Sequence, residues 1–293
     1  MTNHGTNAPT DQQNPGTLFL VATPIGNLED MSFRAIRHLK EVDYIAAEDT
    51  RHTIKLLNHF EISKRMVSYH EHNKMEKGPE IIRDIQSGLN VALVTDAGTP
   101  GISDPGEDLV RLCHTHGVTV TSIPGPAALI NALILSGKPT RRFAFEGFLP
   151  MNKKDRRQRL EVLSSETRTF ILYEAPHKLK TTLNDLAKAL GEERAITLTR
   201  ELTKKFEEIQ NMTISEAIAY YKVTDPRGEY ALVIEGVSED AVKENEKALF
   251  EALSLEDHMD HYLKQGHSKK EAIKLIAKDR DKPKRDIYDY FNK

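Results

Sequence analysis

The chain has 293 residues, of which 39% are hydrophobic, and its net charge at pH 7 is −3. This length and apolar content are sufficient for a hydrophobic core and favour two domains over one. No apolar run approaches the roughly 18 residues of a membrane span, and the single cysteine, Cys113, excludes an internal disulfide. We therefore expect a cytoplasmic protein with no membrane contact.

Residues 1–16 contain almost no apolar side chains and are predicted to form a disordered tail. From residue 17 to residue 136, strand-like and helical segments alternate. We expect strands at residues 17–23, 43–48, 65–70, 90–96 and 118–123, and helices near residues 33–40, 53–60, 77–86, 107–115 and 127–135. Five such βα units predict a first α/β domain, residues 17–136, with a parallel sheet and helices on both faces.

The loops after these five strands carry the unusual residues. Because parallel strands point the same way, all five loops should meet at one edge of the sheet, where open α/β sheets bind ligands. The fourth loop, residues 96–106, is rich in glycine, proline and aspartate, which leaves its backbone groups accessible to a ligand. Asp96 directly follows a buried strand, so we expect it to bind the ligand.

The sequence leaves two interpretations of Asp104 open. It either contacts the ligand or is the N-cap of a helix, with Pro105 at the first helical position and Glu107 closing a capping box. Asp96 and Asp104 suit a ligand with ammonium or ribose hydroxyl groups better than one with phosphates. Neither a P-loop motif nor a GxGxxG fingerprint occurs, which disfavours nucleoside triphosphates and NAD.

A second α/β domain is predicted over residues 137–237. Its strands are expected at residues 143–149, 169–176, 195–202 and 229–236, and its helices near residues 156–164, 178–190 and 214–221. Lys153, Lys154, Arg156 and Arg157 crowd the start of the first of these helices, where positive charge opposes the helix dipole. They either contact phosphate or form a solvated basic face.

The last part, residues 238–293, has no strand signal and is predicted to be helical. Ser268 and Glu271 form a capping box, and Pro283 should open the next helix at its first position. Two short helices joined in this way resemble a helix-turn-helix. From Lys264 to Lys293 there are ten Lys or Arg against five Asp or Glu, so a polyanion is a plausible partner.

Eight segments carry a family resemblance. In chain order they are ATPIGNLEDMSFRA, AEDTRHT, DAGTPGISDPG, IPGPAA, FEGFLP, YEAPHKL, TRELTKKFEE and RGEYALVIEG. In this order and spacing they resemble the 16S rRNA cytidine 2′-O-methyltransferases of the small-subunit methyltransferase I group, within the tetrapyrrole-methylase fold family. The terminal helices are similar to the helix-turn-helix extension of that group.

The resemblance implies two α/β domains with a cofactor cleft between them, S-adenosylmethionine as cofactor, and a homodimer. Carried over by position, the cofactor-binding residues are Pro24, Asp96, Ala97, Gly98, Thr99, Pro100, Ile102, Ser103, Pro124, Ala127, Tyr173, Glu174, Tyr230, Ala231 and Leu232. Tetrapyrrole methylases proper carry a GxGPGD-like first loop. Here Gly26 is retained but Asn27 replaces the aspartate, which disfavours porphyrin-type substrates.

Methyl transfer to a ribose hydroxyl requires alignment of the acceptor oxygen and removal of its proton. The catalytic candidates are Asp49, Glu146, Glu174 and His177. The RNA-binding candidates are Arg51, Lys153, Lys154, Arg156, Arg157, Lys178, Lys282, Lys284 and Arg285. Glu48 and Asp49 are equally well interpreted as solvated carboxylates, paired with Arg51. No metal is expected, because none of the histidine pairs has a third ligand at a usual spacing.

The function predicted is S-adenosylmethionine-dependent methylation of a cytidine 2′-hydroxyl in 16S rRNA, with the rRNA or the 30S subunit as partner. Three alternatives stay open. They are a tetrapyrrole methyltransferase of the same fold, a non-enzymatic RNA-binding protein, and a base methyltransferase.

Overall fold

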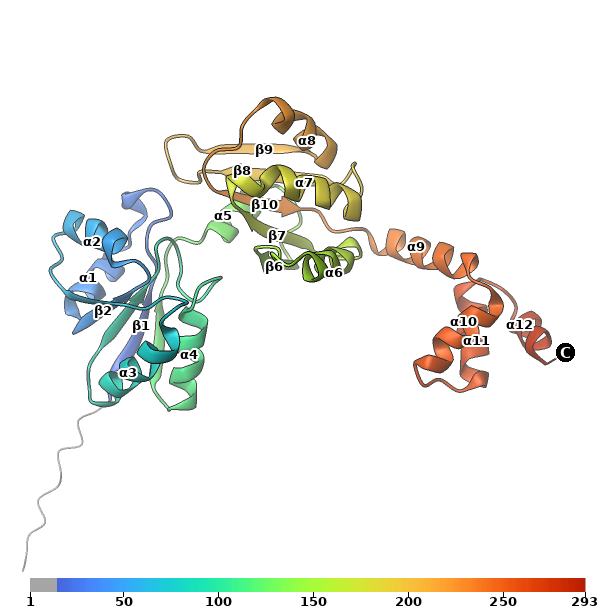
Figure 1. Cartoon of the computed structure of the whole chain (residues 1–293), viewed down its shortest axis with the longest axis horizontal. Helices are drawn as coiled ribbons and strands as arrows, with labels where there is room; N and C mark the ends of the chain where they lie inside the picture. The colour runs from blue at the N-terminus through green and yellow to red at the C-terminus, as the bar shows by residue number, and fades with distance from the viewer. Residues whose placement is uncertain (1–14, 293) are drawn as a thin grey trace, which may run out of the picture.

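The computed structural model describes residues 15–292 and comprises two α/β domains followed by a group of helices (Figure 1). Residues 1–14 of the predicted tail lie outside the described residues. Gly16, at the end of that tail, is buried, and its N–H donates to the Ile85 carbonyl over 2.8 Å. The contacts of the first domain therefore include Gly16, one residue before the first strand.

The first domain has the predicted parallel sheet, in the order β3-β2-β4-β1-β5. Its strands are β1 (Thr17–Val21), β2 (Tyr44–Ala47), β3 (Arg65–Ser68), β4 (Val91–Val94) and β5 (Thr119–Ile123). Helices α1 (Phe33–Glu41) and α2 (Thr50–His59) pack on one face, with the 3-10 helix η1 (Leu28–Asp30) before α1. Helices α3 (Lys74–Gln86) and α4 (Gly106–Thr115) pack on the other.

Residues of the central strand β4 alternate between the two cores. Val91 and Leu93 pack against α3 and α4, whereas Ala92 and Val94 pack against α1 and α2. Every residue of β4 is buried, which explains its continuous apolar sequence. Cys113 on α4 is buried in the same core, and burial raises the pKa of its thiol to about 11, so it is a packing residue.

The second domain has a mixed sheet in the order β6-β7-β10-β8-β9 (Figure 1). Its strands are β6 (Phe143–Gly147), β7 (Thr169–Glu174), β8 (Ala195–Arg200), β9 (Glu208–Thr213) and β10 (Tyr230–Ile234). Strand β10 is antiparallel to β7 and β8, and β9 is antiparallel to β8. Helices α6 (Lys153–Ser164), α7 (Pro176–Leu190) and α8 (Ile214–Val223) cover one face.

The edge strand β9 was not predicted from the sequence. It reads EIQNMT and has only two apolar side chains, of which Met212 packs against the domain core and Ile209 is exposed. An edge strand buries little surface, so its hydrophobic pattern is weak.

Helix α5 (Ala128–Leu135) packs on the face of the second sheet that α6 to α8 leave open. Leu129, Ala132 and Leu133 contact Ile171 of β7 and Val233 of β10 in one apolar cluster. This helix was expected in the first domain, but its apolar contacts belong to the second. The crossing between the domains therefore lies before α5, near residues 124–127.

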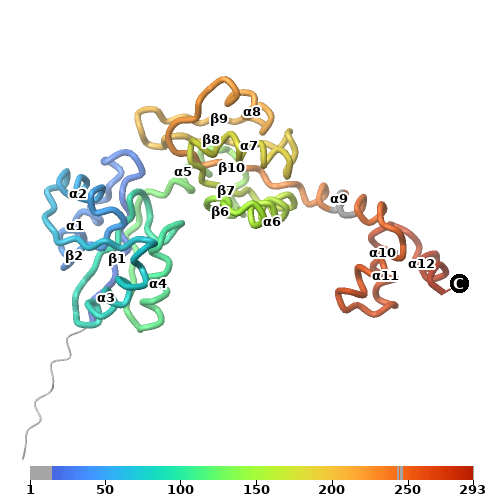
Figure 2. The backbone as a smooth tube through the Cα atoms, in the orientation of Figure 1, coloured from blue at the N-terminus to red at the C-terminus, as the bar shows by residue number. Residues whose placement is uncertain are grey.

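Helices α9 (Glu239–Ala252), α10 (Leu255–Lys264), α11 (Lys269–Asp279) and α12 (Lys284–Phe291) follow the second domain (Figure 2). The last three share a small core that includes Met259, Ile276 and Ile287. The predicted capping box of Ser268 and Glu271 is confirmed. Pro283 is the N-cap of α12, with ψ of 130°, and not its first helical residue.

His258 is completely buried in this C-terminal unit. Its ring stacks on Phe250, Arg280 Nε donates to its Nδ1 over 3.2 Å, and Asp279 lies 3.3 Å from its Nε2. Because Nδ1 accepts this hydrogen bond, it does not carry a proton itself. Burial, with the charge of Arg280 second, lowers the pKa of His258 below its usual value.

We expect acid to destabilise the C-terminal unit. Because the folded-state pKa of His258 is lowered, its stabilising effect is present above the unfolded pKa of about 6.5 and is lost as pH falls through the folded pKa. The urea midpoint, followed by tyrosine fluorescence, should fall between pH 7 and pH 5. A His258→Gln variant should show a smaller fall; an equal fall in both proteins would contradict this assignment.

Candidate functional site

A cavity of about 470 Å³ lies between the two α/β domains. The loops after β1 and β4 form one wall, and residues 127–129 at the start of α5 form the floor. The other wall comes from the end of β7 with the start of α7, the end of β8 and the start of β10. The volume is within the usual range of about 300–1,000 Å³ for small-molecule sites.

Hydrogen bonds fasten the first-domain loops to one another. Thr23 and Gly98 exchange two backbone hydrogen bonds, of 2.9 and 3.1 Å. Thr99 Oγ1 donates to the Pro126 carbonyl over 2.9 Å, which ties the loop after β4 to the entry of α5. Gly98 has φ of +84°, a conformation that favours glycine. The wall formed by these loops is therefore preorganised.

Asp104 holds the 96–106 loop together by hydrogen bonds to the backbone of the same loop. Its carboxylate accepts the backbone N–H groups of Gly101, Ile102 and Gly106 at 2.8, 2.9 and 2.7 Å. Helix α4 starts at Gly106 with Pro105 at the N-cap, so the predicted placement of Asp104 as the N-cap of a capping box was wrong. Asp104 is nevertheless structural, because its carboxylate is fully used inside the loop.

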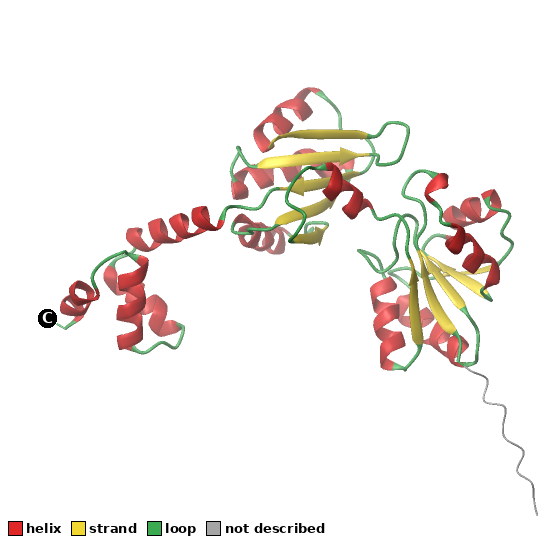
Figure 3. Ribbon diagram, turned by 180° about the vertical axis from the view of Figure 1, so that it is seen from behind, coloured by secondary structure: helices red, strands yellow, loops and turns green. Residues whose placement is uncertain are grey.

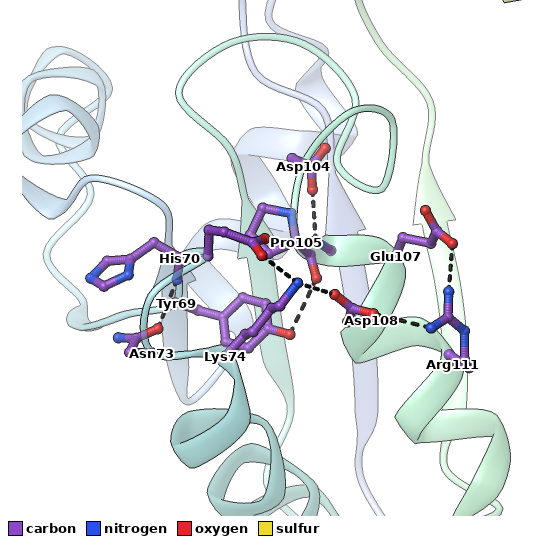
Figure 4. Close-up of polar contacts among 11 residues, drawn as sticks. Tyr69, His70, Asn73, Lys74, Asp104, Pro105, Glu107, Asp108 and Arg111 are labelled. Carbon is purple, nitrogen blue, oxygen red and sulfur yellow. Dashed lines mark hydrogen bonds and ion pairs between the residues drawn. The ribbon is translucent and has the colours of Figure 1, made fainter. Parts of the chain in front are cut away.

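A polar network anchors the same loop at its far end. Lys74 Nζ lies 2.7 Å from Asp108 of α4 and 2.7 Å from Glu71, and Tyr69 Oη donates to the Pro105 carbonyl over 3.2 Å (Figure 4). Hydrogen bonds to Asp108 and Glu71 raise the pKa of Lys74, which keeps its ammonium charged. This network fixes the end of the loop against α3.

The two domains touch closely beside the cavity. A Cβ at Gly26 would lie 2.4 Å from Lys204 Cγ and 3.0 Å from the Leu202 carbonyl oxygen. A Cβ at Gly147 would lie 3.0 Å from Ser103 Oγ. Only residues without a side chain allow these two approaches, so Gly26 and Gly147 set how closely the walls of the cavity meet.

Most residues expected at the cofactor site do line the cavity. They are Ala97, Gly98, Thr99, Ile102, Ala127, Tyr173, Glu174, Tyr230 and Ala231, together with the catalytic candidate His177. Tyr173 also fixes the floor, since its hydroxyl accepts the Leu129 N–H over 3.0 Å. Burial raises the pKa of Tyr173, which keeps this hydroxyl neutral.

Other expected residues do not line the cavity. They are Pro24, Asp96, Pro100, Ser103, Pro124 and Leu232. Asp96 instead joins two strand ends, because its Oδ1 accepts the Asp49 N–H over 3.2 Å. The Leu232 side chain is fully buried in the core beneath α7 and α8, since it points to the opposite face of β10 from Ala231.

The sequence analysis missed further lining residues. They are Ile25, Ala128, Leu129, Phe148, Ala175, Pro176, Thr199, Glu201, Leu202, Lys204 and Glu229. Several of them belong to segments that were already singled out, FEGFLP, YEAPHKL and TRELTKKFEE. Those segments were the available signal, but periodicity does not tell which of their side chains face a cavity.

Three catalytic candidates are engaged elsewhere. Glu174 is buried, and its oxygens accept from Thr182 Oγ1 over 2.5 Å and from the Ala175 N–H over 2.8 Å. Glu146 accepts from Arg159 Nε over 2.6 Å and does not line the cavity. Both carboxylates already accept hydrogen bonds from neighbouring groups, which makes each a weaker base.

Asp49 is likewise paired. Arg51 lies 2.7 Å from its carboxylate, and the same carboxylate accepts the Arg51 N–H at the start of α2. These hydrogen bonds hold the pKa of Asp49 well below its usual range. The pairing with Arg51 is therefore confirmed for Asp49 but not for Glu48, which is half-buried and accepts the Asp96 N–H over 3.4 Å. His177, exposed at the start of α7, is the one catalytic candidate without a recorded polar partner in residues 15–292.

Three charged side chains lie together at one end of the cavity. Lys204 Nζ is 3.0 Å from Glu201 and 3.2 Å from Glu229. Glu201 has φ of +52°, and its side chain fills the space left by Gly228, where a Cβ would lie 2.5 Å from its Cδ. Two carboxylates against one ammonium make this end of the cavity net negative.

A basic groove of about 940 Å³ lies between α6 and α7 and shares His177 with the cavity. Its cationic lining residues are Lys153, Arg156, Arg157, Lys178 and Lys188, against the two carboxylates Glu161 and Asp185. Lys153, Arg157 and Lys188 form no ion pair within the described chain, whereas Lys154 lines an adjoining, smaller hollow.

Arg156 has a structural role in this groove. Its Nε donates to the Asp185 carboxylate over 2.8 Å, and its Nη2 donates to the Thr182 hydroxyl over 2.8 Å. Thr182 in turn donates to Glu174, so the chain of hydrogen bonds links the groove to the cavity wall. Arg156 thereby positions Glu174 and is not free to hold a phosphate.

The described residues contain no group of three or more His, Cys, Asp or Glu suited to a metal ion. Within residues 15–292, none of the helices is long and apolar enough to cross a membrane.

Two α/β domains with a ligand-sized cavity between them are the architecture of a known family of methylases. Residues 17–218 match the family described as Tetrapyrrole (Corrin/Porphyrin) Methylases, and the chain belongs to this family. Among its relatives, the ribosomal RNA small subunit methyltransferase I of Halalkalibacterium halodurans is 52% identical over 94% of this chain and 95% of the relative. The protein of the same name from Bacillus subtilis (strain 168) is 50% identical over 94% of each.

Solved structures share the fold at low sequence identity. A uroporphyrin-III C-methyl transferase from Thermus thermophilus, complexed with S-adenyl homocysteine, is 20% identical with a TM-score of 0.53, over 77% of this chain and 99% of that one. A conserved hypothetical protein from Aeropyrum pernix K1 is 17% identical with a TM-score of 0.60, over 78% and 88%.

Proposed function

We propose that the chain is an S-adenosylmethionine-dependent methyltransferase that acts on the ribose 2′-hydroxyl of a cytidine in 16S rRNA. The observation that carries the proposal is that the interdomain cavity and the basic groove meet at His177. The cavity has the volume of a site for a small cofactor, and the cationic lining of the groove suits a phosphate backbone. The printed names of the two relatives above support an rRNA substrate. The preference for a cytidine ribose rests on the motif resemblance.

The residues of the cavity fit this cofactor. Phe148 and Tyr173, with ring centroids 5.8 Å apart, offer aromatic surface for an adenine ring. The net negative end at Glu201, Lys204 and Glu229 favours a cationic ligand. When bound, S-adenosylmethionine supplies an electrophilic methyl carbon and a neutral thioether leaving group.

The chain's own residues must hold the acceptor ribose and take up its proton. His177 lies at the border of cavity and groove, and the unprotonated nitrogen of a neutral imidazole is a proton acceptor. We assign it the uptake of the 2′-hydroxyl proton. Lys178, the next residue, lines the groove and is placed to hold an adjacent phosphate.

Labelled methyl transfer tests the proposal. The protein is incubated with S-adenosylmethionine and 30S subunits that lack the modification, and 2′-O-methyl sites are then mapped. Labelling at a single cytidine ribose is expected. Labelling at a base would identify a base methyltransferase. In a parallel reaction, transfer to uroporphyrinogen III and none to RNA would identify the tetrapyrrole alternative, which the shared fold favours.

Asp104→Asn should weaken cofactor binding although Asp104 does not line the cavity. The amide nitrogen cannot accept the N–H groups that the carboxylate now accepts, and each such charge-assisted bond is worth about 1.5–3 kcal/mol. Loosening the loop should raise the Kd for S-adenosylhomocysteine by about tenfold or more, measured by calorimetry. Glu107→Gln, which loses only the ion pair with Arg111, is the control. Equal affinities would show that the loop does not depend on Asp104.

We infer that the chain forms a homodimer through the outward face of α5. Ile130, Ile134 and Leu135 are 44, 62 and 43% exposed on a helix that is apolar on nearly all sides. Surface helices usually carry polar residues on the outer face. Ile134→Glu should shift the protein from dimer to monomer in sedimentation, whereas Val223→Glu, at a 90% exposed position, should not. A monomeric unsubstituted protein would contradict the inference.

A further inference from the structure

Helices α10, α11 and α12 form a unit that projects beyond the second domain at the end of α9 (Figures 1 and 3). Its core of Met259, Ala272, Ile273, Ile276, Ala277 and Ile287 comes from these three helices alone. Helix α9 has 14 residues and spans roughly 21 Å at 1.5 Å per residue. This spacing separates the C-terminal unit from the groove between α6 and α7.

One face of α11 carries an uncompensated row of lysines. Lys270, Lys274 and Lys278 follow one another at intervals of four residues, which places them along one face of the helix. All three are exposed, and none has an ion pair within the described chain. The apolar residues of α11 face the core of the unit on another side. We call these three residues the α11 lysine stripe.

The carboxylates of α11 do not neutralise the stripe. Glu271 is used in the capping box, where it accepts from the Ser268 N–H and hydroxyl at 2.9 and 2.7 Å. Asp279 accepts from the Tyr262 hydroxyl and faces His258. Like charges four residues apart destabilise a helix by about 0.2–0.5 kcal/mol per pair, a cost that a bound polyanion removes.

Helix α12, by contrast, is balanced in charge. Arg285 lies 3.8 Å from Asp289, and Asp286 accompanies Lys284 in the first turn. The sequence analysis nominated Lys282, Lys284 and Arg285 as RNA-binding residues. Helix α11 is better suited to bind a polyanion, because three of its lysines lie on one face and its carboxylates are already hydrogen-bonded.

We propose that the α11 lysine stripe is a second RNA-binding surface that contacts phosphates of the rRNA away from the target nucleotide. The inference rests on the proposed function and adds a docking contact to it. Two linked contacts on one RNA act through effective concentration, so α9 raises the overall affinity without any new contact at the cavity. A membrane surface is disfavoured, because an interfacial helix inserts an apolar face and that of α11 is buried in the unit.

The test uses the full-length protein with Lys270, Lys274 and Lys278 all changed to Gln. Glutamine has nearly the helix propensity of lysine, so the helix should remain folded, and circular dichroism checks this. Binding to transcribed 16S rRNA is measured by filter binding from 50 to 200 mM KCl. We expect affinity to fall about tenfold to hundredfold at 100 mM and the slope of log K against log salt to fall by about 2.

The matched control changes the same three lysines to arginine, which keeps the charge and should keep both affinity and slope. S-adenosylhomocysteine affinity should be unchanged in all variants, and the glutamine variant should show a raised KM for RNA with kcat preserved. An unchanged slope and KM in the glutamine variant would overturn the proposal. Absence of methyl transfer by the unsubstituted protein would instead count against the proposed function, since the salt slope is measured without catalysis.

Discussion

Replacing His177 with alanine is expected to lower kcat for methyl transfer about 100-fold or more, the usual contribution of a positioned general base. His177 is exposed at the border of the cavity and the groove, whereas the buried Glu174 already accepts two hydrogen bonds. Affinity for S-adenosylhomocysteine should change little, because the imidazole lies at the rim. The measurement is single-turnover methyl transfer to 30S subunits, with calorimetry for the cofactor.

Two carboxylate variants are the controls for His177. Asp49→Asn and Glu146→Gln each break an ion pair, with Arg51 and Arg159 respectively, and neither residue lines the cavity. Their effect on kcat should be small beside that of His177→Ala. If Asp49→Asn abolished transfer while His177→Ala retained it, the proton acceptor would belong to the edge of the first sheet.

Removing three groove cations should weaken RNA binding strongly. Lys153, Arg157 and Lys188 line the groove without ion pairs in the described chain, so each is free to contact a phosphate. Changing all three to glutamine should lower the salt slope by about 2 and reduce affinity at 100 mM salt by about one to two orders of magnitude. Filter binding to 16S rRNA measures both quantities, and cofactor affinity should remain unchanged.

The control removes the same number of charges elsewhere. Arg34 and Lys40 on α1 and Lys55 on α2 are exposed on the first domain, away from the groove. Changing these three to glutamine should leave the salt slope nearly unchanged. Equal losses in the two triple variants would mean that only net charge matters and that the groove has no special part in binding. Arg156 is left intact in both, because its ion pair with Asp185 supports the groove.

Much of the fold could be predicted from local pattern. Strands β2 and β4 of the first sheet are short apolar segments buried on both faces, and the alternation of strands with helices along the chain favours a parallel sheet. The capping box at Ser268 is a local hydrogen-bond motif and was found at its predicted position. Strand β9 was missed because an edge strand buries few side chains.

The motif resemblance located the cavity but not the role of each residue. Ala97, Gly98, Thr99 and Tyr173 line it as expected. Asp96 was expected to line it as well, but its carboxylate accepts the Asp49 N–H at a neighbouring strand end. A carboxylate in a loop can accept a hydrogen bond from a ligand or from a backbone N–H. Which of the two lies within hydrogen-bonding distance is not encoded in the local sequence.

The sequence by itself determined the parallel first sheet, the loop 96–106, the basic run before α6 and the family, because these depend on neighbours along the chain. Only the tertiary structure decided that α5 packs on the second domain, that Arg156 is tied to Asp185 while Arg157 is free, and that His177 joins cavity and groove. Those outcomes depend on contacts between side chains that are far apart in the sequence. Arg156 and Asp185, for example, are separated by 29 residues. Packing between elements sets such distances, and local periodicity carries no information about them.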